Sequence, residues 1–294
     1  DRQGTGFRPG NQTPRKLNVK NFGNIFYCRQ EGHGSLNEIG IPRRLGHIWI
    51  GPNPAPRDWM KTWQEKHPDW EYTLYDNAFL ESFEFRTREL IDYYLSVNQY
   101  AGVADLMRYE ILFKYGGFLA AADSICVHPI DELFEGAKAY TIYENEFTRG
   151  KLVSPILACE PGNPFVGKLI ERLCELRPDD LIAPWMTTGN YFVAEMIEEH
   201  EPEIRIFPSY TMIPVHFTGR VYQGVNKVYA VQMFGTTRSA YKARSNRFDR
   251  FNIRKRLEKR RLRERQMQFW ARCRKFENQL FKHSDQWSGN ISDK

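Results

Sequence analysis

Asp105-Leu-Met-Arg-Tyr109 and, five residues later, Lys114-Tyr-Gly-Gly-Phe-Leu-Ala-Ala-Ala-Asp123 form the most informative part of the chain. Apolar residues recur at helical spacing over 100–115, and the Gly-Gly pair that follows is typical of a helix C-terminus. The apolar run after the glycines predicts a buried strand over 118–127 that is interrupted at Asp123. A carboxylate at the end of such a strand lies where α/β sheets bind their ligands.

The segments around this stretch predict an alternating α/β order. The run 45–50 predicts a first buried strand, 57–66 a helix that ends before Pro68, and 70–75 a second strand. A strand, a helix and a strand in this order predict a parallel βαβ unit at the start of the domain. We expect further helices over 78–98, 131–135, 164–176 and 191–200, and further strands over 139–143, 152–159, 204–207 and 228–232, the last two completing the sheet.

Asp105 and Arg108 lie three residues apart on the predicted helix, so both side chains project from one helix face. Taken alone, this spacing is most often a surface ion pair, which contributes little to stability. The helix, however, leads directly into the strand that is interrupted at Asp123. This context favours a ligand site over a surface ion pair.

The stretch 105–123 resembles the core signature of retaining glycosyltransferases of the GT-A fold that carry a DXD motif. The similarity is to mannosyltransferases and to bacterial capsule or lipo-oligosaccharide sugar transferases, with the clostridial glucosylating toxins as more distant relatives. Other blocks resemble the family's first strand, its second strand with the following turn, and its late strand: His47-Ile-Trp-Ile-Gly51, Leu74-Tyr-Asp-Asn-Ala-Phe-Leu80 and Tyr229-Ala-Val-Gln-Met-Phe-Gly235. The resemblance implies a GT-A catalytic domain over 41–240, with a Rossmann-like mixed sheet flanked by helices.

The resemblance also implies a role for each residue that matches the family's motifs. Asp105 and Arg108 are expected to act as the catalytic pair that holds the hydroxyls of the donor sugar. Trp49 is expected to lie against the nucleotide base, and Asp76 or Asn77 near the nucleoside. From the residues alone, a core aromatic side chain is the alternative for Trp49, and turn formation is the alternative for Asp76 or Asn77.

A divalent cation is also implied by the resemblance. Asp123 is expected to bind Mn²⁺ or Mg²⁺, which would bridge the two phosphates of a UDP-sugar or GDP-sugar donor. Oxygen ligands suit both cations, and the cation would neutralise the charge that builds on the leaving diphosphate. Glu144 and Glu146 follow the predicted strand 139–143 and are candidates for the edge of the site, although solvated loop acids are commoner.

The chain departs from the family's pattern at three places. Ala121 stands where the first DXD carboxylate is expected, which predicts weak metal binding and a nearly inactive chain, by deliberate substitution or by natural decay. Gln232-Met233 replaces a frequent His-His pair, which leaves Gln232 as the remaining candidate metal ligand there. Leu119 replaces a tyrosine and Thr188-Gly189-Asn190 replaces a more usual Gly-Pro, so we expect an unusual acceptor side.

The charge of the chain is concentrated near its C-terminal end. Between Arg238 and Lys282 there are 17 Lys and Arg against four acids, a local net of +13, so the remainder carries −7 of the overall +6. Residues 254–265 are strongly helix-forming, and apolar residues continue at helical spacing from Phe269 to Leu280. We expect a basic amphipathic arm over 241–294 that binds an anionic membrane surface through 244–282. Packing of its apolar stripe on the catalytic domain is the alternative, and no nucleic-acid-reading module is recognised.

Composition limits the remaining classes. With 41% hydrophobic and 27% charged residues the chain is that of a folded globular protein, and residues 1–40 read as an irregular lead-in. There is no apolar run of membrane-spanning length, and the five cysteines contain no CxxC pair. We therefore expect a cytoplasmic enzyme of polysaccharide or glycan assembly, peripheral to the inner membrane face, that transfers a hexose to a glycan or lipid-linked acceptor. A toxin-like protein glycosyltransferase, or a non-catalytic pseudoenzyme that binds nucleotide sugar or glycan, are the alternatives.

Overall fold

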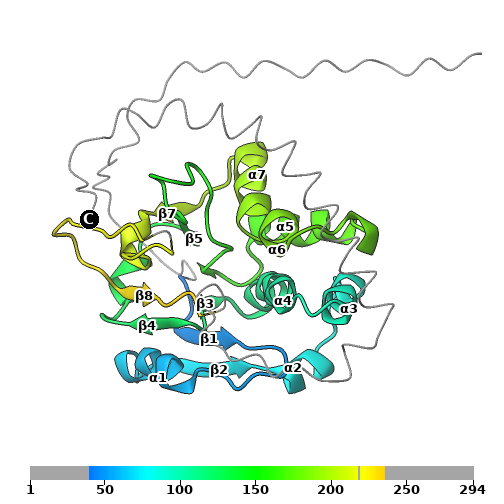
Figure 1. Cartoon of the computed structure of the whole chain (residues 1–294), viewed down its shortest axis with the longest axis horizontal. Coiled ribbons are helices and arrows are strands. Elements are labelled where there is room, and N and C mark those ends of the chain that lie inside the picture. The colour runs from blue at the N-terminus through cyan, green and yellow to red at the C-terminus, as the bar shows by residue number, and fades with distance from the viewer. Residues whose placement is uncertain (1–39, 218, 236–294) are drawn as a thin grey trace, which may run out of the picture. The chain divides into compact units, whose positions relative to one another are not determined.

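The structure is a computed structural model in which residues 40–217 and 219–235 are described (Figure 1). Six strands form a mixed sheet in the order β2-β1-β3-β6-β5-β7, and β4 and β8 form a separate pair. Helices flank the six-stranded sheet, so the predicted α/β class with a mixed sheet is confirmed. Apart from residue 40, the predicted lead-in over 1–40 and basic arm over 241–294 lie outside the described residues.

The predicted βαβ opening is confirmed. Strand β1 (Arg44–Ile48) runs parallel to β2 (Glu71–Tyr75), and α1 (Arg57–Lys66) connects them. On its other side β1 runs parallel to β3 (Gly117–Ala120). Side chains of β3 alternate between two hydrophobic cores, because Phe118 belongs to one and the next residue to the other. Cores on both faces of the sheet explain why β3 is a continuous buried apolar run.

The two glycines after 100–115 end the predicted helix, α4 (Tyr100–Tyr115), and start β3. Gly116 has φ 64° and Gly117 has φ 93°, a conformation that other residues rarely adopt. A Cβ atom on Gly117 would also come within 2.5 Å of the carbonyl oxygen of Arg44. The Gly-Gly pair therefore permits both the tight turn and the close approach of β3 to β1.

The helical segment predicted over 78–98 is confirmed, and it consists of two helices, α2 (Asn77–Ser82) and α3 (Arg88–Ser96). The helical conformation is interrupted between them, where the backbone N–H groups of Arg86 and Thr87 donate hydrogen bonds to the buried carboxylate of Glu110. The hydroxyl of Thr87 donates to the same carboxylate. This tertiary contact from α4 starts a new helix, and no local pattern reveals it.

The second half of the sheet differs in part from the prediction. Strand β6 (Ala158–Cys159) lies antiparallel between β3 and β5 (Ala139–Ile142) and is much shorter than the predicted 152–159. Pro155 has no N–H to donate to a ladder, which explains why the strand does not extend through it. The remaining elements are 3₁₀ turns at Asp131–Leu133, Pro178–Asp180 and Ser209–Thr211 and helices α5 (Pro164–Cys174), α6 (Pro184–Thr187) and α7 (Asn190–His200).

The last two predicted strands separate. Strand β7 (Arg205–Phe207) joins the sheet parallel to β5, as predicted. Strand β8 (Ala230–Gln232) instead pairs antiparallel with β4 (Ser124–Cys126), so the prediction that it completes the main sheet is wrong. The polar break at Asp123 is the physical reason, because the chain leaves the main sheet there before β4 begins.

All strands of the main sheet except β6 point the same way. The carboxyl ends of β1, β2, β3, β5 and β7 therefore share one edge, which is where open α/β sheets bind ligands. In the described part of the chain, no helix is both long and apolar enough to span a membrane.

Candidate active site

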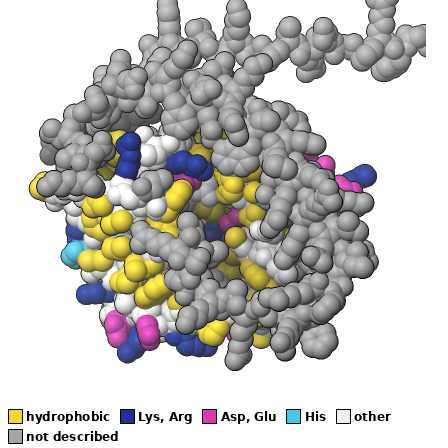
Figure 2. Space-filling model, in the orientation of Figure 1, with side chains coloured by type: hydrophobic (Ala, Val, Ile, Leu, Met, Phe, Trp, Pro, Cys, Tyr) yellow, Lys and Arg dark blue, Asp and Glu magenta, His cyan; other side chains and the backbone are white. Residues whose placement is uncertain are grey.

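Most of the predicted site residues follow strands at this shared carboxyl edge. Trp49 follows β1, Asp76 and Asn77 follow β2, and Ala121 and Asp123 follow β3. On the face of the molecule seen in Figure 2, acidic and basic side chains lie in a hollow between apolar side chains. The topology thus brings residues that are up to about 75 positions apart to one side of the sheet.

Asp123 and Gln232, both predicted as metal ligands, are in direct contact. The Nε2 amide of Gln232 donates to Oδ1 of Asp123 over 2.6 Å, and the N–H of Gly235 donates to Oδ2 over 2.8 Å. The pairing of β4 with β8 sets this contact, since it places Ser124 opposite Gln232. Both carboxylate oxygens of Asp123 therefore already accept hydrogen bonds, one from Gln232 in β8 and one from Gly235 after it.

The residues present do not fit a divalent cation held by protein groups alone. Cations of this type take several oxygen ligands, whereas the described residues contain no group of three or more His, Cys, Asp or Glu that could hold a metal. Ala121 contributes only a methyl group, and its carbonyl oxygen accepts from the backbone N–H and the hydroxyl of Ser124. Asp123 and Gln232 therefore do not form a complete set of protein ligands for a cation within the described residues, and metal binding at this place stays a prediction.

Arg108 is partly buried and is anchored to the backbone of neighbouring segments. Its Nη1 donates to the carbonyl oxygens of Leu119, over 2.6 Å, and Ile156, over 3.2 Å, which ties α4 to β3 and to the segment before β6. Burial lowers the pKa of this guanidinium, and the negative charge of Asp105 partly offsets that effect. Within residues 40–217 and 219–235, no ion pair of 4.0 Å or less joins Arg108 to Asp105, so the simple surface-pair interpretation is wrong.

Asp105 lies against the turn that precedes α7. The hydroxyl of Thr188 donates to its Oδ2 over 3.1 Å, and a Cβ atom on Gly189 would come within 2.9 Å of the same oxygen. Burial raises the pKa of Asp105 to about 7, against the opposing effects of the Arg108 charge and the Thr188 hydrogen bond. A carboxyl group with this pKa exchanges a proton near neutral pH and can either accept or donate a hydrogen bond to a sugar hydroxyl.

The structure also brings in His47, for which the sequence pattern predicts no role. His47 is fully buried, and its Nδ1 lies 3.2 Å from the Tyr72 hydroxyl. Burial, reinforced by the positive charge of Arg108, lowers the pKa of His47 to about 3. This imidazole is therefore neutral at physiological pH. In the sequence, the only indication that His47 lies near the site is its position in the block His47-Ile-Trp-Ile-Gly51.

The residues predicted to contact the nucleotide have clear local functions. Nε1 of Trp49 donates to the carbonyl of Asn53 over 2.7 Å, and the side chain is only partly buried, so it is not a core residue. Asp76 caps α2 by accepting from two backbone N–H groups. The Asn77 side chain exchanges two hydrogen bonds with the backbone of Gly51. Asp76 and Asn77 thus order the loops at this edge, and their contact with a nucleotide stays a prediction.

Glu144, at the end of β5, is not a solvated loop acid. Its carboxylate accepts from Nδ2 of Asn190 over 3.0 Å and lies 3.5 Å from Nε of Arg149 and 3.7 Å from Nε2 of His216. Glu146 instead accepts from the backbone N–H of Ser209. Glu144 therefore joins three other parts of the chain beside the predicted donor residues.

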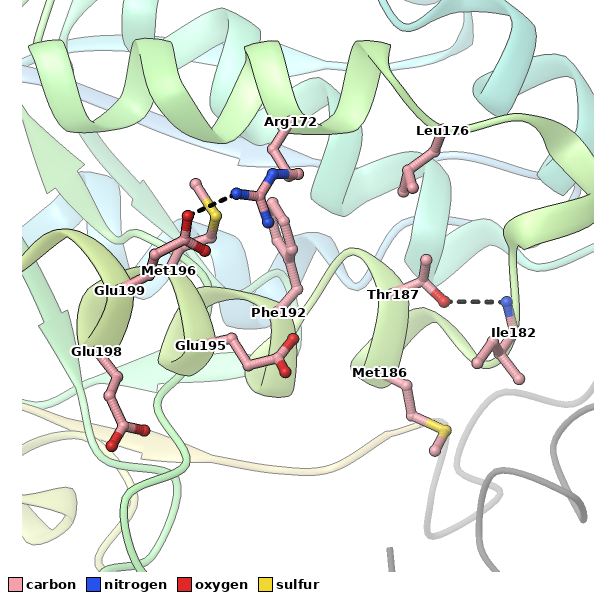
Figure 3. A pocket seen from close by; sticks show the side chains of 10 residues that line it. All are labelled: Arg172, Leu176, Ile182, Met186, Thr187, Phe192, Glu195, Met196, Glu198 and Glu199. Carbon is pink, nitrogen blue, oxygen red and sulfur yellow. Dashed lines mark hydrogen bonds and ion pairs between the residues drawn. The ribbon is translucent and has the colours of Figure 1, made fainter. Parts of the chain in front are cut away.

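A separate pocket of about 470 Å³ lies between α5, α6 and α7 (Figure 3). Its lining includes the apolar side chains of Phe192 and Met196, while Glu195 and the ion pair of Arg172 with Glu199 lie at its polar side. None of the predicted site residues lines this pocket. It is therefore distinct from the predicted donor site.

Comparison with known proteins identifies the central segment. Residues 56–140 match the model of a family described as a glycosyltransferase sugar-binding region containing a DXD motif. This segment is therefore similar to the DXD glycosyltransferases. The matched region contains five predicted site residues (Asp76, Asn77, Asp105, Arg108 and Asp123) as well as the departure at Ala121.

Similar curated proteins come from two yeasts. Inositol phosphoceramide mannosyltransferase 3 of Schizosaccharomyces pombe is 26% identical over 47% of this chain and 39% of its own length. Mannosyl phosphorylinositol ceramide synthase CSH1 of Saccharomyces cerevisiae is 26% identical over 64% of this chain and 49% of its own length. The chain thus spans about half or less of these relatives. A solved structure titled PaToxG glycosyltransferase matches with a TM-score of 0.46 and 15% identity over 54% of this chain and 70% of that one.

Proposed function

We propose that the chain is a nucleotide-sugar-dependent, retaining glycosyltransferase that moves a hexose from a UDP-sugar or GDP-sugar to a glycan or lipid-linked acceptor. The observation that carries the proposal is the arrangement around β3. Arg108 is anchored to the carbonyl of Leu119, and Asp123 follows the same strand within the matched glycosyltransferase region. Asp105, one helical turn before Arg108, completes a polar set on the helix that packs against this strand.

In this proposal Asp105 and Arg108 orient the donor sugar, and the carboxyl edge holds its diphosphate. The bond between the anomeric carbon and the diphosphate oxygen breaks, and the acceptor oxygen forms the new bond on the same face of the sugar. The acceptor proton passes to the leaving phosphate oxygen. This route needs no carboxylate nucleophile, and its stereochemical outcome is retention.

Ala121 is proposed to impair the reaction in this chain. The DXD pattern calls for a second carboxylate beside Asp123, and changes around metal ligands commonly cost about 10- to 100-fold in metal affinity or activity. We propose that Mn²⁺ or Mg²⁺ dependence returns when aspartate is restored at 121. The same observation favours one alternative function, a non-catalytic protein that binds nucleotide sugar or glycan without turnover.

The acceptor class is proposed from the names of the relatives, which are mannosyltransferases of inositol phosphoceramide and a synthase of its mannosylated form. They favour a mannosyl donor and a lipid with a hydroxyl-rich headgroup. We further propose peripheral attachment to a membrane surface, from the cytoplasmic side, through the basic residues 244–282, which lie outside the described residues. Deleting 244–294 is expected to abolish binding to vesicles of phosphatidylserine and phosphatidylcholine, and unchanged binding would contradict this part.

Calorimetric titration tests the main proposal. UDP-glucose and GDP-mannose are titrated, with and without Mn²⁺, into this chain and into its Ala121→Asp variant. We expect one nucleotide sugar to bind, with Mn²⁺-dependent affinity at least 10-fold higher in the variant. Turnover by the variant distinguishes an impaired enzyme from a non-catalytic binder. If neither protein binds either nucleotide sugar, the donor-site assignment of Asp105, Arg108 and Asp123 is wrong.

A further inference from the structure

A second polar group of side chains lies beside the proposed donor site and is separate from the residues assigned to the donor. We call it the Glu144 cluster; it consists of Glu144, Arg149, Asn190 and Trp185. Glu144 and Arg149 lie in the loop that follows β5, Trp185 lies in α6, and Asn190 is the first residue of α7. Four side chains from separate segments converge here. The polar ones could form hydrogen bonds with water on an exposed loop without the free-energy cost of partial burial.

The cluster combines hydrogen-bonding groups of both kinds in a partly buried place. The side chain of Glu144 is 13% exposed and that of Arg149 is 24% exposed. Oε2 of Glu144 accepts from the Asn190 amide over 3.0 Å, whereas Oε1 lies 3.5 Å from Nε of Arg149 without forming a hydrogen bond. That Nε atom is buried and has no hydrogen-bond partner in the part of the chain that the structure describes. A buried donor of this kind is a rare and costly feature.

A ligand hydroxyl group would satisfy this arrangement. A hydroxyl donates one hydrogen bond and accepts others, so it can donate to the carboxylate of Glu144 while accepting from Nε of Arg149. Trp185 adds an aromatic surface, with the guanidinium carbon of Arg149 5.4 Å from the centre of its ring. Aromatic rings offer an apolar face to the C–H groups of a ligand while neighbouring polar groups fix its orientation. This combination suits a ring that carries several hydroxyls.

The cluster is also joined to the proposed donor site by three consecutive residues. Thr188 donates to Asp105, and Asn190, two residues later, donates to Glu144. Gly189 lies between them, and its position is close to both Oδ2 of Asp105 and the Cα of Trp185. A ligand on the Glu144 cluster would therefore be adjacent to a sugar held by Asp105.

From these contacts we infer that the Glu144 cluster is the subsite for the ring of the acceptor, a hydroxyl-rich six-membered ring such as a hexose or a cyclitol. This inference rests on the proposed function, because it takes Asp105 as the position of the donor sugar. One ring hydroxyl donates to Glu144 and accepts from Nε of Arg149, Asn190 fixes the carboxylate, and Trp185 packs against the ring face.

Ligand-observed NMR on the full chain tests the subsite, with methyl α-D-mannopyranoside and myo-inositol as probes. We expect at least one probe to bind, and Glu144→Gln to weaken it by about 10-fold, since a charged acceptor is lost. Trp185→Ala is expected to abolish binding, whereas Trp185→Phe retains most of it. Glu198→Gln, a change on the exposed side of α7, serves as the matched control and is expected to bind as the parent does. Thermal unfolding confirms that each variant is folded.

The outcomes separate this inference from the proposed function. If neither probe binds the parent chain, or if folded Glu144→Gln and Trp185→Ala bind as well as the parent does, the subsite is overturned. If Glu144→Gln weakens GDP-mannose or UDP-glucose in parallel with the ring probes, the cluster belongs to the donor site and the acceptor assignment is wrong. If no nucleotide sugar binds even the Ala121→Asp variant while the ring probes depend on Glu144 and Trp185, the donor proposal fails and the ring site stands.

Discussion

Gln232 donates from its side-chain amide to Asp123 over 2.6 Å, across 109 positions of sequence. The N–H of Gly235 holds the other oxygen of the same carboxylate. The segment that follows β8 therefore closes the edge of the site beside Ala121, and it fixes the orientation of the one DXD carboxylate that the chain retains.

The first prediction concerns this contact. Gln232→Leu removes the amide donor and leaves one oxygen of a partly buried carboxylate without its partner, at a cost of about 1 to 3 kcal/mol in the free energy of unfolding. In the Ala121→Asp background the change is also expected to weaken nucleotide-sugar binding, because Asp123 loses its fixed orientation. Urea denaturation and calorimetry measure the two effects. Met233→Leu is the control, since the hydrogen bond between Met233 and Asp123 joins a backbone N–H to a backbone carbonyl and does not involve the Met233 side chain; an equal effect of both variants would contradict the role of the Gln232 side chain.

A second prediction concerns Gly189, whose missing side chain makes room for the site. A Cβ atom there would lie within 2.9 Å of both Oδ2 of Asp105 and the backbone of Trp185. Gly189→Ala is therefore expected to displace Asp105 and to cost about 1 to 3 kcal/mol of stability, as forced overpacking does. Gly40→Ala is the matched control, because a Cβ atom on Gly40 would meet nothing within 4 Å. Thermal unfolding of the two variants checks the prediction, and equal melting temperatures would show that the turn yields without strain.

The elements that were predicted correctly from the sequence are those whose signals are local. The Gly-Gly pair after α4 and the apolar run of β1 carry their own physical reasons, so the helix end and the parallel opening were correct. The family resemblance also assigned Asp123 and Gln232 to one site; the structure brings the two side chains into contact, and their role as metal ligands stays a prediction. Local patterns cannot, however, show that Glu110 caps a helix 23 residues away or that β8 leaves the main sheet.

The Glu144 cluster shows the same limit within the site. Glu144 and Asn190 are 46 positions apart, and each taken alone has the pattern of an ordinary loop or helix-start residue. Their contact depends on the order of β5, β6 and the helices after them, which no short window of sequence determines. The sequence named Glu144 as a candidate for the edge of the site, and the unusual Thr188-Gly189-Asn190 block indicated an atypical acceptor side. Neither signal indicated that Glu144 and Asn190 meet.

A third prediction concerns Arg108, which joins α4 to two backbone carbonyls. Arg108→Lys keeps the charge but loses the planar group whose Nη1 reaches both Leu119 and Ile156. We expect a loss of about 1 to 3 kcal/mol in unfolding free energy and weaker nucleotide-sugar binding in the Ala121→Asp background. Arg172→Lys, on the exposed ion pair with Glu199, is the control and is expected to change stability by less than about 1 kcal/mol. Comparable losses in the two variants would argue against a special role for Arg108.

The fourth prediction is a pH dependence that belongs to Asp105. Burial raises its pKa to about 7 in the folded protein, whereas an unfolded Asp titrates near about 4. Between these values the folded protein holds a proton that the unfolded chain has released, so the parent loses stability as pH rises from about 4 to about 7. Asp105→Asn has no such proton, and its stability relative to the parent should therefore increase over the same range.

Urea denaturation of both proteins at several pH values from 4 to 8 measures this difference. The parent and Asp105→Asn share every other titrating group, so the effects of those groups cancel in the comparison. His47 is one of them: its pKa is lowered to about 3, so it costs stability only as pH falls below the ordinary histidine pKa of about 6.5. Gly40→Ala removes no titratable group and places its methyl group in open space, so it is the control and should differ from the parent by a nearly constant amount. A constant difference for Asp105→Asn as well would mean that Asp105 is ionised across the range, and the group would then meet a donor sugar as a charged hydrogen-bond acceptor only.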